Sequence, residues 1–417
     1  MKTTPFTALA VLLATLLNLR AEPVRTDLNP ALLYYQAFLL EPKPLPDADW
    51  DYLGSKAGRE QKLPERFGPL LAGYDNEFKL VRVAAQQKAP CNWGIDMSAG
   101  PDTFLPHLRF IKAVAVASQP RAIWDLQHGD QAAARDDLLA AFVLGRNAAQ
   151  DRTVIGALVQ YACNAITDAT VAGNFGQFSP ETLQQLVAGF EAAPVPGAMA
   201  TAILTEKANH VDWLASQLRQ LQVQHPETAV NLLAAIETNS ELAPLENNGD
   251  HPATNFWQLA IAASGGTRVG MLKLIQETEP LYLQLAEIMA LPPAEYEARI
   301  QPFAQQIKQS QNPFIQLLFV DPLRPRVKEL RIQAWQAMVR AAVEYKLHGQ
   351  AGLNSVRDPL GNGPFTFERF VFEGVDRGFE LKSAYAGLQY PCALIFVEKE
   401  GTPFHVEGPY IGQAIQP

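Results

Sequence analysis

The sequence predicts a mostly α-helical protein, built of stacked antiparallel helical hairpins and carrying a small β appendage at its C-terminus. Apolar residues recur three and four positions apart, as at Leu105, Leu108, Ile111 and Ala115, which is typical of one face of a helix. After Gly349 the pattern changes to short runs rich in phenylalanine, separated by turn residues. Apolar residues make up 48% of the 417 positions, enough to bury a sizeable core.

The first 21 residues are typical of a cleaved export signal. Lys2 precedes a mostly apolar stretch from Pro5 to Leu19, and Ala21 supplies the small residue expected at a cleavage point. The stretch is too short to span a bilayer comfortably, so an uncleaved anchor is the less favoured alternative. We therefore expect removal of residues 1–21 and export of the mature protein to the periplasm or the extracellular space, with no integral membrane span.

Helix starts and apolar periodicity place the helices in order. Asn29 before Pro30, and Ser179 before Pro180, each combine a capping side chain with proline at the first helical position. Periodic, alanine-rich segments supply the rest. The expected helices span 31–40, 74–87, 132–147, 154–172, 201–223, 267–291, 293–309 and 322–347, with others starting at 103 and 180.

The C-terminal segment is expected to be a small sheet. Strands are predicted around 365–372, 379–382 and 393–397. A sheet of three short strands is not stable alone, and the segment must therefore pack on the helices. The predicted organisation is a signal at 1–21, a helical domain at 22–349 and a β-rich segment at 350–417.

Charge argues against a nucleic-acid partner. The formal net charge is −9, and it becomes −11 when the signal removes two cations, Lys2 and Arg20, and no acid. A protein that grips nucleic acid needs a basic face. No glycine-rich loop follows a strand, so we expect no nucleotide cofactor.

One hairpin has a recognisable pattern. Gly129 and Asp130 make a tight turn, and Ala134, Ala141 and Leu144 then fall where close helix contact needs small or apolar residues. This pattern resembles the second helix of a tetratricopeptide repeat, and the resemblance implies a right-handed helical array or bundle. No second copy occurs at a period of about 34 residues, so one such hairpin is expected rather than a repeat array.

A second resemblance rests on three short segments. The sequence CNWGID at 91–96, LPHL at 105–108 and DDLLAA at 136–141 together are similar to exported, alanine- and leucine-rich helical bacterial proteins with a "CDWG" loop. Asn92 stands where that group has aspartate. The segment DPLGNGPF at 358–365 is similar to the ending of the same group, and to the tail of pseudopilin-like proteins. The group has no assigned activity, so the resemblance implies no chemistry.

The loop at 91–107 is the best local candidate for a site. Trp93, Asp96 and His107 could form a binding pocket with polar ends. The favoured alternative is a structural plug, with Trp93 buried and Asp96 capping the next turn, because large aromatics in loops usually serve packing. Cys91 and Cys392 each follow a proline, and a disulfide between them is possible in an oxidising compartment.

Catalytic and metal motifs give little support for an enzyme. Glu206 and His210 share a helix face, but the His-Glu-x-x-His pattern of zinc proteases is absent, and so is the Gly-x-Ser-x-Gly elbow. We therefore expect no metal site and name no catalytic residue. Paired acids could serve glycan hydrolysis, although helix caps explain most of them. The acids in or near the resembling segments are Asp96, Asp102, Asp136 and Asp137.

The function expected from these features is a non-enzymatic structural or protein-interaction component of the cell envelope, with another envelope protein as its partner. One alternative is a hydrolase that acts on an envelope or extracellular glycan through acids such as Asp96. The other alternative is a protein that binds a small ligand in its helical body.

Overall fold

The computed structural model describes residues 27–43, 45–54, 62–240, 242, 256–319, 324–372, 374–385, 387 and 392–399. The predicted signal at 1–21 and the last residues of the predicted β segment lie outside them. The chain is mostly helical with a three-stranded antiparallel sheet near the C-terminus, which confirms the predicted fold class at that level. No helix in the described part is long and apolar enough to cross a membrane.

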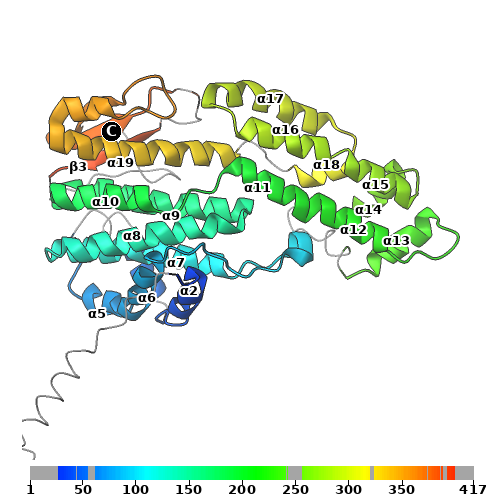
Figure 1. The fold of residues 1–417 in the computed structure, drawn as a ribbon, viewed down its shortest axis with the longest axis horizontal. Coiled ribbons are helices and arrows are strands. Elements are labelled where there is room, and N and C mark those ends of the chain that lie inside the picture. Colours follow the sequence, from blue (N-terminus) through cyan, green and yellow to red (C-terminus); the bar gives the residue numbers. More distant parts are fainter. Residues whose placement is uncertain are drawn as a thin grey trace, which may run out of the picture.

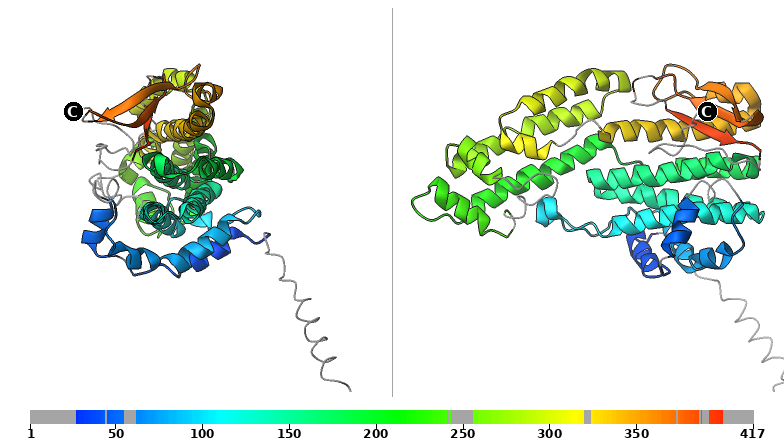
Figure 2. Two further views of the ribbon diagram at one scale, coloured as in Figure 1. Left: turned by 90° about the vertical axis from the view of Figure 1, so that its left-hand side faces the viewer. Right: turned by 180° about the vertical axis from the view of Figure 1, so that it is seen from behind.

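The N-terminal part forms a layered helical body (Figures 1 and 2). The hairpin α7–α8 and the next helix α9 run back and forth against one another, while α6 packs on α8 and α2 packs on α6. Its elements are α2 (Pro30–Phe38), α3 (Asp47–Gly54), α5 (Phe67–Ala72), α6 (Asp75–Ala85), the 3-10 helix η1 (Met97–Asp102), α7 (His107–Gln127), α8 (Gln131–Ala148), η2 (Ala149–Asp151), α9 (Val154–Gly173), η3 (Phe175–Gln177) and α10 (Pro180–Ala192).

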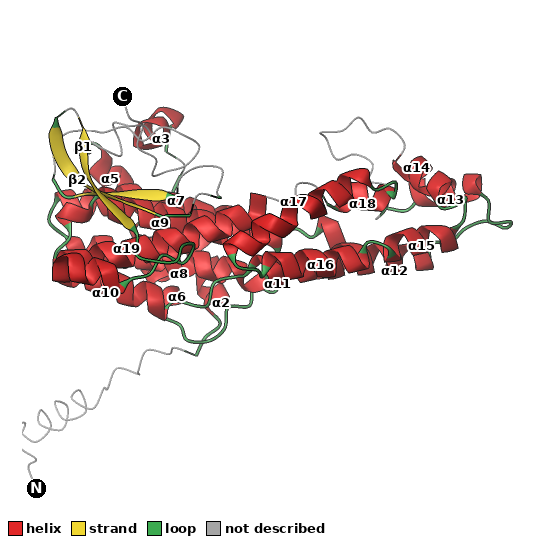
Figure 3. Cartoon of the chain, turned by 90° about the horizontal axis from the view of Figure 1, so that it is seen from above, coloured by secondary structure: helices red, strands yellow, loops and turns green. Residues whose placement is uncertain are grey.

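The middle of the chain forms an arm that extends away from this body (Figures 1 and 3). The arm consists of α11 (Met199–Glu206), the π-helix η4 (Lys207–Asp212), α12 (Trp213–Gln220), α13 (Ala229–Glu237), α14 (Phe256–Ala263), α15 (Arg268–Gln276), α16 (Glu279–Met289), α17 (Pro293–Gln309) and α18 (Pro313–Leu318). The predicted helix at 201–223 is thus interrupted by a π segment. The one predicted at 267–291 divides at Thr278, because Pro280 starts a new helix.

Helix α19 (Arg324–Ser355) returns to the body and packs on α9 and α10. It was expected to end near 347. Gly349 takes a non-helical conformation with φ of +59°, and the helix then resumes to Ser355. Glycine tolerates this positive φ, so the kink occurs where the sequence predicted the end of the helix.

The sheet lies at the opposite end of the molecule from the arm (Figure 3). Strands β1 (Thr366–Phe372), β2 (Val375–Lys382) and β3 (Ala393–Val397) pair in that order, with Phe379 opposite Phe396. These two rings pack edge-on against Phe175, with ring centres 5.8 and 5.3 Å away, respectively. The sheet therefore buries its aromatic face on the helices, as a small sheet requires.

A strap formed by the loop around η1 joins the body to the arm. The indole nitrogen of Trp213 donates to the carbonyl of Ser98 at 3.0 Å. Gly100 lies against the same indole with φ of +60°, and a Cβ there would come within 2.4 Å of the ring. Both the backbone angle and the close approach require glycine at this position.

Candidate functional site

The predicted loop is packed into the body by Trp93. The Trp93 indole is buried, and it stacks on the rings of His107 and Tyr34 with centres 4.6 and 5.7 Å away, respectively. Its Nε1 donates to the backbone carbonyl of Asn147 at 2.8 Å. A buried tryptophan needs a partner for this N–H, and the end of α8 supplies one. These are the contacts of a structural plug between α2, α7 and α8.

His107 and Asp96 lie in opposite environments. His107 starts α7 with 0% of its surface exposed, and its Nε2 lies 3.6 Å from a carboxylate oxygen of buried Asp151. Asp96 is exposed and caps η1 by accepting a hydrogen bond from the Ser98 amide at 2.9 Å. Hydrogen bonds from Ser98 lower the pKa of Asp96. The structure therefore brings Trp93 and His107 together but does not join Asp96 to them in an open pocket.

The predicted disulfide is not formed in this structure. Cys91, Cys163 and Cys392 are all free and buried. Cys91 packs in the cluster beneath α2, whereas Cys392 belongs to the cluster shared by the sheet and α19. The proline that precedes each cysteine carries no information about this separation. Burial raises the pKa of each thiol to about 12, so all three behave as small apolar side chains.

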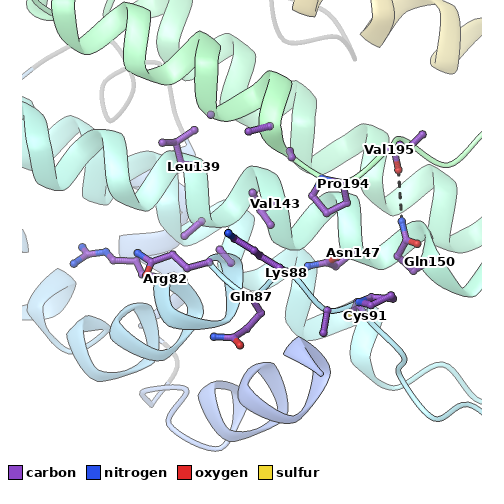
Figure 4. Close-up of a pocket in the computed structure, with 18 of the residues that line it drawn as sticks. Arg82, Gln87, Lys88, Cys91, Leu139, Val143, Asn147, Gln150, Pro194 and Val195 are labelled. Carbon is purple, nitrogen blue, oxygen red and sulfur yellow. Dashed lines mark hydrogen bonds between the residues drawn. The ribbon is translucent and has the colours of Figure 1, made fainter. Parts of the chain in front are cut away.

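A groove of about 730 Å³ lies beside the plug and is open to solvent (Figure 4). It forms where the end of α6, the middle of α8 and the end of α10 meet. We call this feature the groove. Its lining residues are Arg82, Ala85, Gln86, Gln87, Lys88, Ala89, Pro90, Cys91, Asp136, Leu139, Ala140, Val143, Asn147, Gln150, Gly189, Ala192, Ala193, Pro194 and Val195.

Small and apolar residues make up most of the groove lining, and polar side chains lie among them. Leu139 and Val143 project from α8, while alanine, glycine and proline make up much of the other walls. At one end, Gln150 of η2 donates to the carbonyl of Val195 at 3.5 Å, which links η2 to the segment after α10. Asn147 also lines the groove, and its side-chain amide donates to the Tyr34 hydroxyl of the plug at 3.1 Å. The plug therefore supports one wall of the groove.

Buried charged residues fix the position of Arg82 in the wall of the groove. Arg82 donates through Nε to Asp137 at 2.7 Å, and Arg121 donates to the other carboxylate oxygen at 2.8 Å. Asp137 is fully buried, so its charge needs these two guanidinium partners. Asp136, the preceding residue, lines the groove and pairs with Arg135 at 2.7 Å. Adjacent aspartates thus have different roles, one structural and one at the groove.

A second polar feature runs through the body interior along α9. Gln160, Asn164 and Asp168 follow one another at four-residue spacing, and all three are fully buried. Neither oxygen of the Asp168 carboxyl and neither polar atom of the Asn164 amide has a hydrogen-bonding partner in the structure. Burial raises the pKa of Asp168 well above its usual range, and it lowers that of nearby Arg146 to about 10. We call these three residues the α9 stripe.

The sequence reasoning missed both the groove and the α9 stripe. The stripe had a visible signal, because three polar residues at i, i+4 and i+8 share one face of an otherwise apolar helix. The groove had none, since its walls come from three segments far apart in the chain. In the arm, Glu206 and His210 are in contact at 3.2 Å, as their spacing predicted. The described residues contain no group of three or more ligands suited to a metal ion.

Comparison with known proteins adds no relative. No family model, no curated protein and no solved structure matches the chain. The similarity to exported proteins with a "CDWG" loop stays a prediction from the sequence. The function is therefore inferred from the geometry of the groove and the chemistry of its walls.

Proposed function

We propose that this protein is an exported, non-enzymatic interaction component of the cell envelope, which binds a segment of a partner protein in the groove. The observation that carries the proposal is the form of the groove: an open hollow lined mostly by small apolar residues, with polar side chains among them. Protein–protein interfaces likewise combine apolar area with polar groups that form hydrogen bonds. Export rests on the predicted signal at residues 1–21.

The helical hairpin that supports the groove fits the same proposal. Gly129 has φ of +79° in the turn between α7 and α8, and Ala134 and Ala141 are completely buried. We propose that this hairpin is a tetratricopeptide-like unit, within a right-handed helical array that holds the groove rigidly. Rigid walls favour binding, because less conformational freedom is lost when the partner docks.

Two alternatives differ in the support they receive. A small-ligand binder gains support from the volume of about 730 Å³, which lies within the range typical of ligand pockets, roughly 300–1,000 Å³. A glycan hydrolase gains less, because its chemistry needs two carboxyl groups on either side of one bond. Asp136 is the one carboxylate among the described residues that line the groove, and Asp96 lies in the strap.

Site-specific photocrosslinking in cells tests the proposal. A photoreactive amino acid at Val195, which is 79% exposed in the groove wall, is compared with one at Val269, which is 76% exposed in the arm. We expect a discrete crosslinked protein from the Val195 position and at most background from the Val269 position. The two sites match in residue type and exposure, so the comparison isolates the groove.

Two further results bear on the proposal. A second probe at Val143, on the α8 wall, should capture the same protein as Val195. Equal or absent crosslinking at all three positions would count against a partner in the groove. A change in melting temperature with a small molecule, without any crosslinked protein, would favour the ligand-binding alternative.

A further inference from the structure

Most charged side chains around the groove have an ion-pair partner, but one lysine has none among the described residues. Arg82 and Arg121 share the buried Asp137, and Arg121 also pairs with Asp75. Asp136 pairs with Arg135, so each of these charged side chains has an ion-pair partner. Lys88 lines the groove and is exposed, and it forms no ion pair with another described residue. Figure 4 shows its side chain reaching into the groove beside Val143. The groove therefore carries one uncompensated positive charge, on a protein whose overall charge is negative.

Arg82 adds directed donors to this positive charge. Its Nε and Nη2 both contact one oxygen of Asp137, which fixes the plane of the guanidinium. Nη1 makes no hydrogen bond to a described residue, and Arg82 lines the groove. A guanidinium that is oriented in advance and keeps free N–H groups is well suited to bind a further carboxylate, because less side-chain freedom is lost on binding.

We infer that the groove recognises an acidic segment of the partner protein, with one carboxylate at Lys88, another at Arg82 and apolar side chains along Leu139 and Val143. This inference rests on the proposed function and specifies the chemistry of the partner. The negative charge of the whole protein opposes an acidic partner at long range. Salt screens that repulsion over about 8–10 Å, so the charges inside the groove decide the preference at contact.

Fluorescence anisotropy with three labelled peptides tests the inference on the mature protein. The peptides alternate leucine with glutamate, with glutamine or with lysine, so that they share apolar content and differ in charge. We expect the glutamate peptide to bind most tightly and the lysine peptide least. Lys88→Glu should weaken binding of the glutamate peptide on the order of tenfold, since a charge-assisted hydrogen bond is lost and a repulsion is gained.

Matched controls separate this result from general charge effects. Lys308→Glu makes the same change at an exposed lysine of α17 in the arm, and should leave all three affinities unchanged. Lys88→Gln should give an intermediate loss for the glutamate peptide. Both positions are exposed, so the variants are expected to fold, and circular dichroism during heating checks this directly.

The outcomes distinguish the inference from the proposed function. Equal binding of the three peptides, or a Lys88→Glu variant that keeps the preference for glutamate, overturns the inference. If Val195 still crosslinks to a partner in either case, the proposed function stands without an acidic partner. Failure of all three peptides to bind also overturns the inference. Loss of specific crosslinking at Val195 overturns the proposed function as well.

Discussion

The plug and the groove are neighbours in the same helical body, and they differ in almost every physical respect. The plug places Trp93 and His107 in a closed stack of rings, away from solvent. The groove is open, and alanine, glycine and proline form much of its surface. Asn147 belongs to both, because its carbonyl holds Trp93 while its side chain lines the groove.

The difference teaches that chemically conspicuous residues can serve packing, while the proposed binding surface lies beside them. Tryptophan, aspartate and histidine in one short loop are typical of a site, yet here the large rings fill space. The groove depends on small residues, which leave room between helices. Structural support and the proposed binding surface thus lie in two adjacent regions, and the variants below separate them.

The largest expected effect is the loss of the plug. Trp93→Ala removes a buried indole between α2, α7 and α8, and should lower the free energy of unfolding by about 3–5 kcal/mol. Urea denaturation followed by circular dichroism measures this change. Val195→Ala, at an exposed position in the groove wall, should stay within about 0.5 kcal/mol of the parent protein. A small loss for Trp93→Ala would show that the loop is not a structural plug.

The α9 stripe offers a second comparison. It is buried like the plug, and it is polar like part of the groove lining. Below pH of about 4 the Asp168 carboxyl holds its proton in both the folded and the unfolded state. At higher pH the unfolded chain loses that proton, whereas burial raises the pKa in the folded protein and retains it. Folding then requires proton uptake, so this residue lowers stability as pH rises.

Asp168→Asn should therefore stabilise the protein at neutral pH, because the amide carries no charge at any pH and folding then needs no proton uptake at this residue. The gain should shrink towards pH 4, where the parent carboxyl is protonated in both states. Urea denaturation at several pH values, with both proteins in the same buffers, measures the difference. A variant less stable than the parent at neutral pH would mean that Asp168 is ionised and satisfied in the folded protein.

The smallest effect is expected at Asp96. Asp96→Ala removes the side chain that accepts from the Ser98 amide, so the first turn of η1 should open more often. Hydrogen exchange measured by mass spectrometry should be faster in the strap and unchanged at the groove. Asp96→Asn keeps a capping oxygen and should preserve most of the protection. Loss of crosslinking at Val195 in the Asp96→Ala variant would show that this loop acts in binding after all.

Much of the fold could be predicted because its signals are local. The caps at Asn29 and Ser179 accept hydrogen bonds from the following backbone as expected, and the strands near 365–372 and 393–397 appear where short apolar and phenylalanine-rich runs predicted them. The break at Thr278 also had a local signal in Pro280, which the apolar periodicity of that segment outweighed. The π segment of η4, which contacts η1 in the strap, had no such signal.

The groove could not be predicted, because it depends on distances between segments and on no motif within one. Lys88, Val143 and Val195 become neighbours only when α6, α8 and α10 pack together. For the same reason, the sequence could not show that the predicted disulfide between Cys91 and Cys392 does not form. Their local sequences are alike, but the fold places them in separate cores. Local patterns specify elements, whereas a binding surface and a disulfide depend on tertiary packing.

Competition at the groove tests the central claim most directly. The partner captured by the photoreactive residue at Val195 is crosslinked in the presence of increasing glutamate–leucine peptide, and separately of lysine–leucine peptide. We expect the glutamate peptide to abolish crosslinking and the lysine peptide to leave it intact, because both acidic peptide and partner need Lys88 and Arg82. Crosslinking that survives the acidic peptide, or that both peptides reduce equally, would contradict the account.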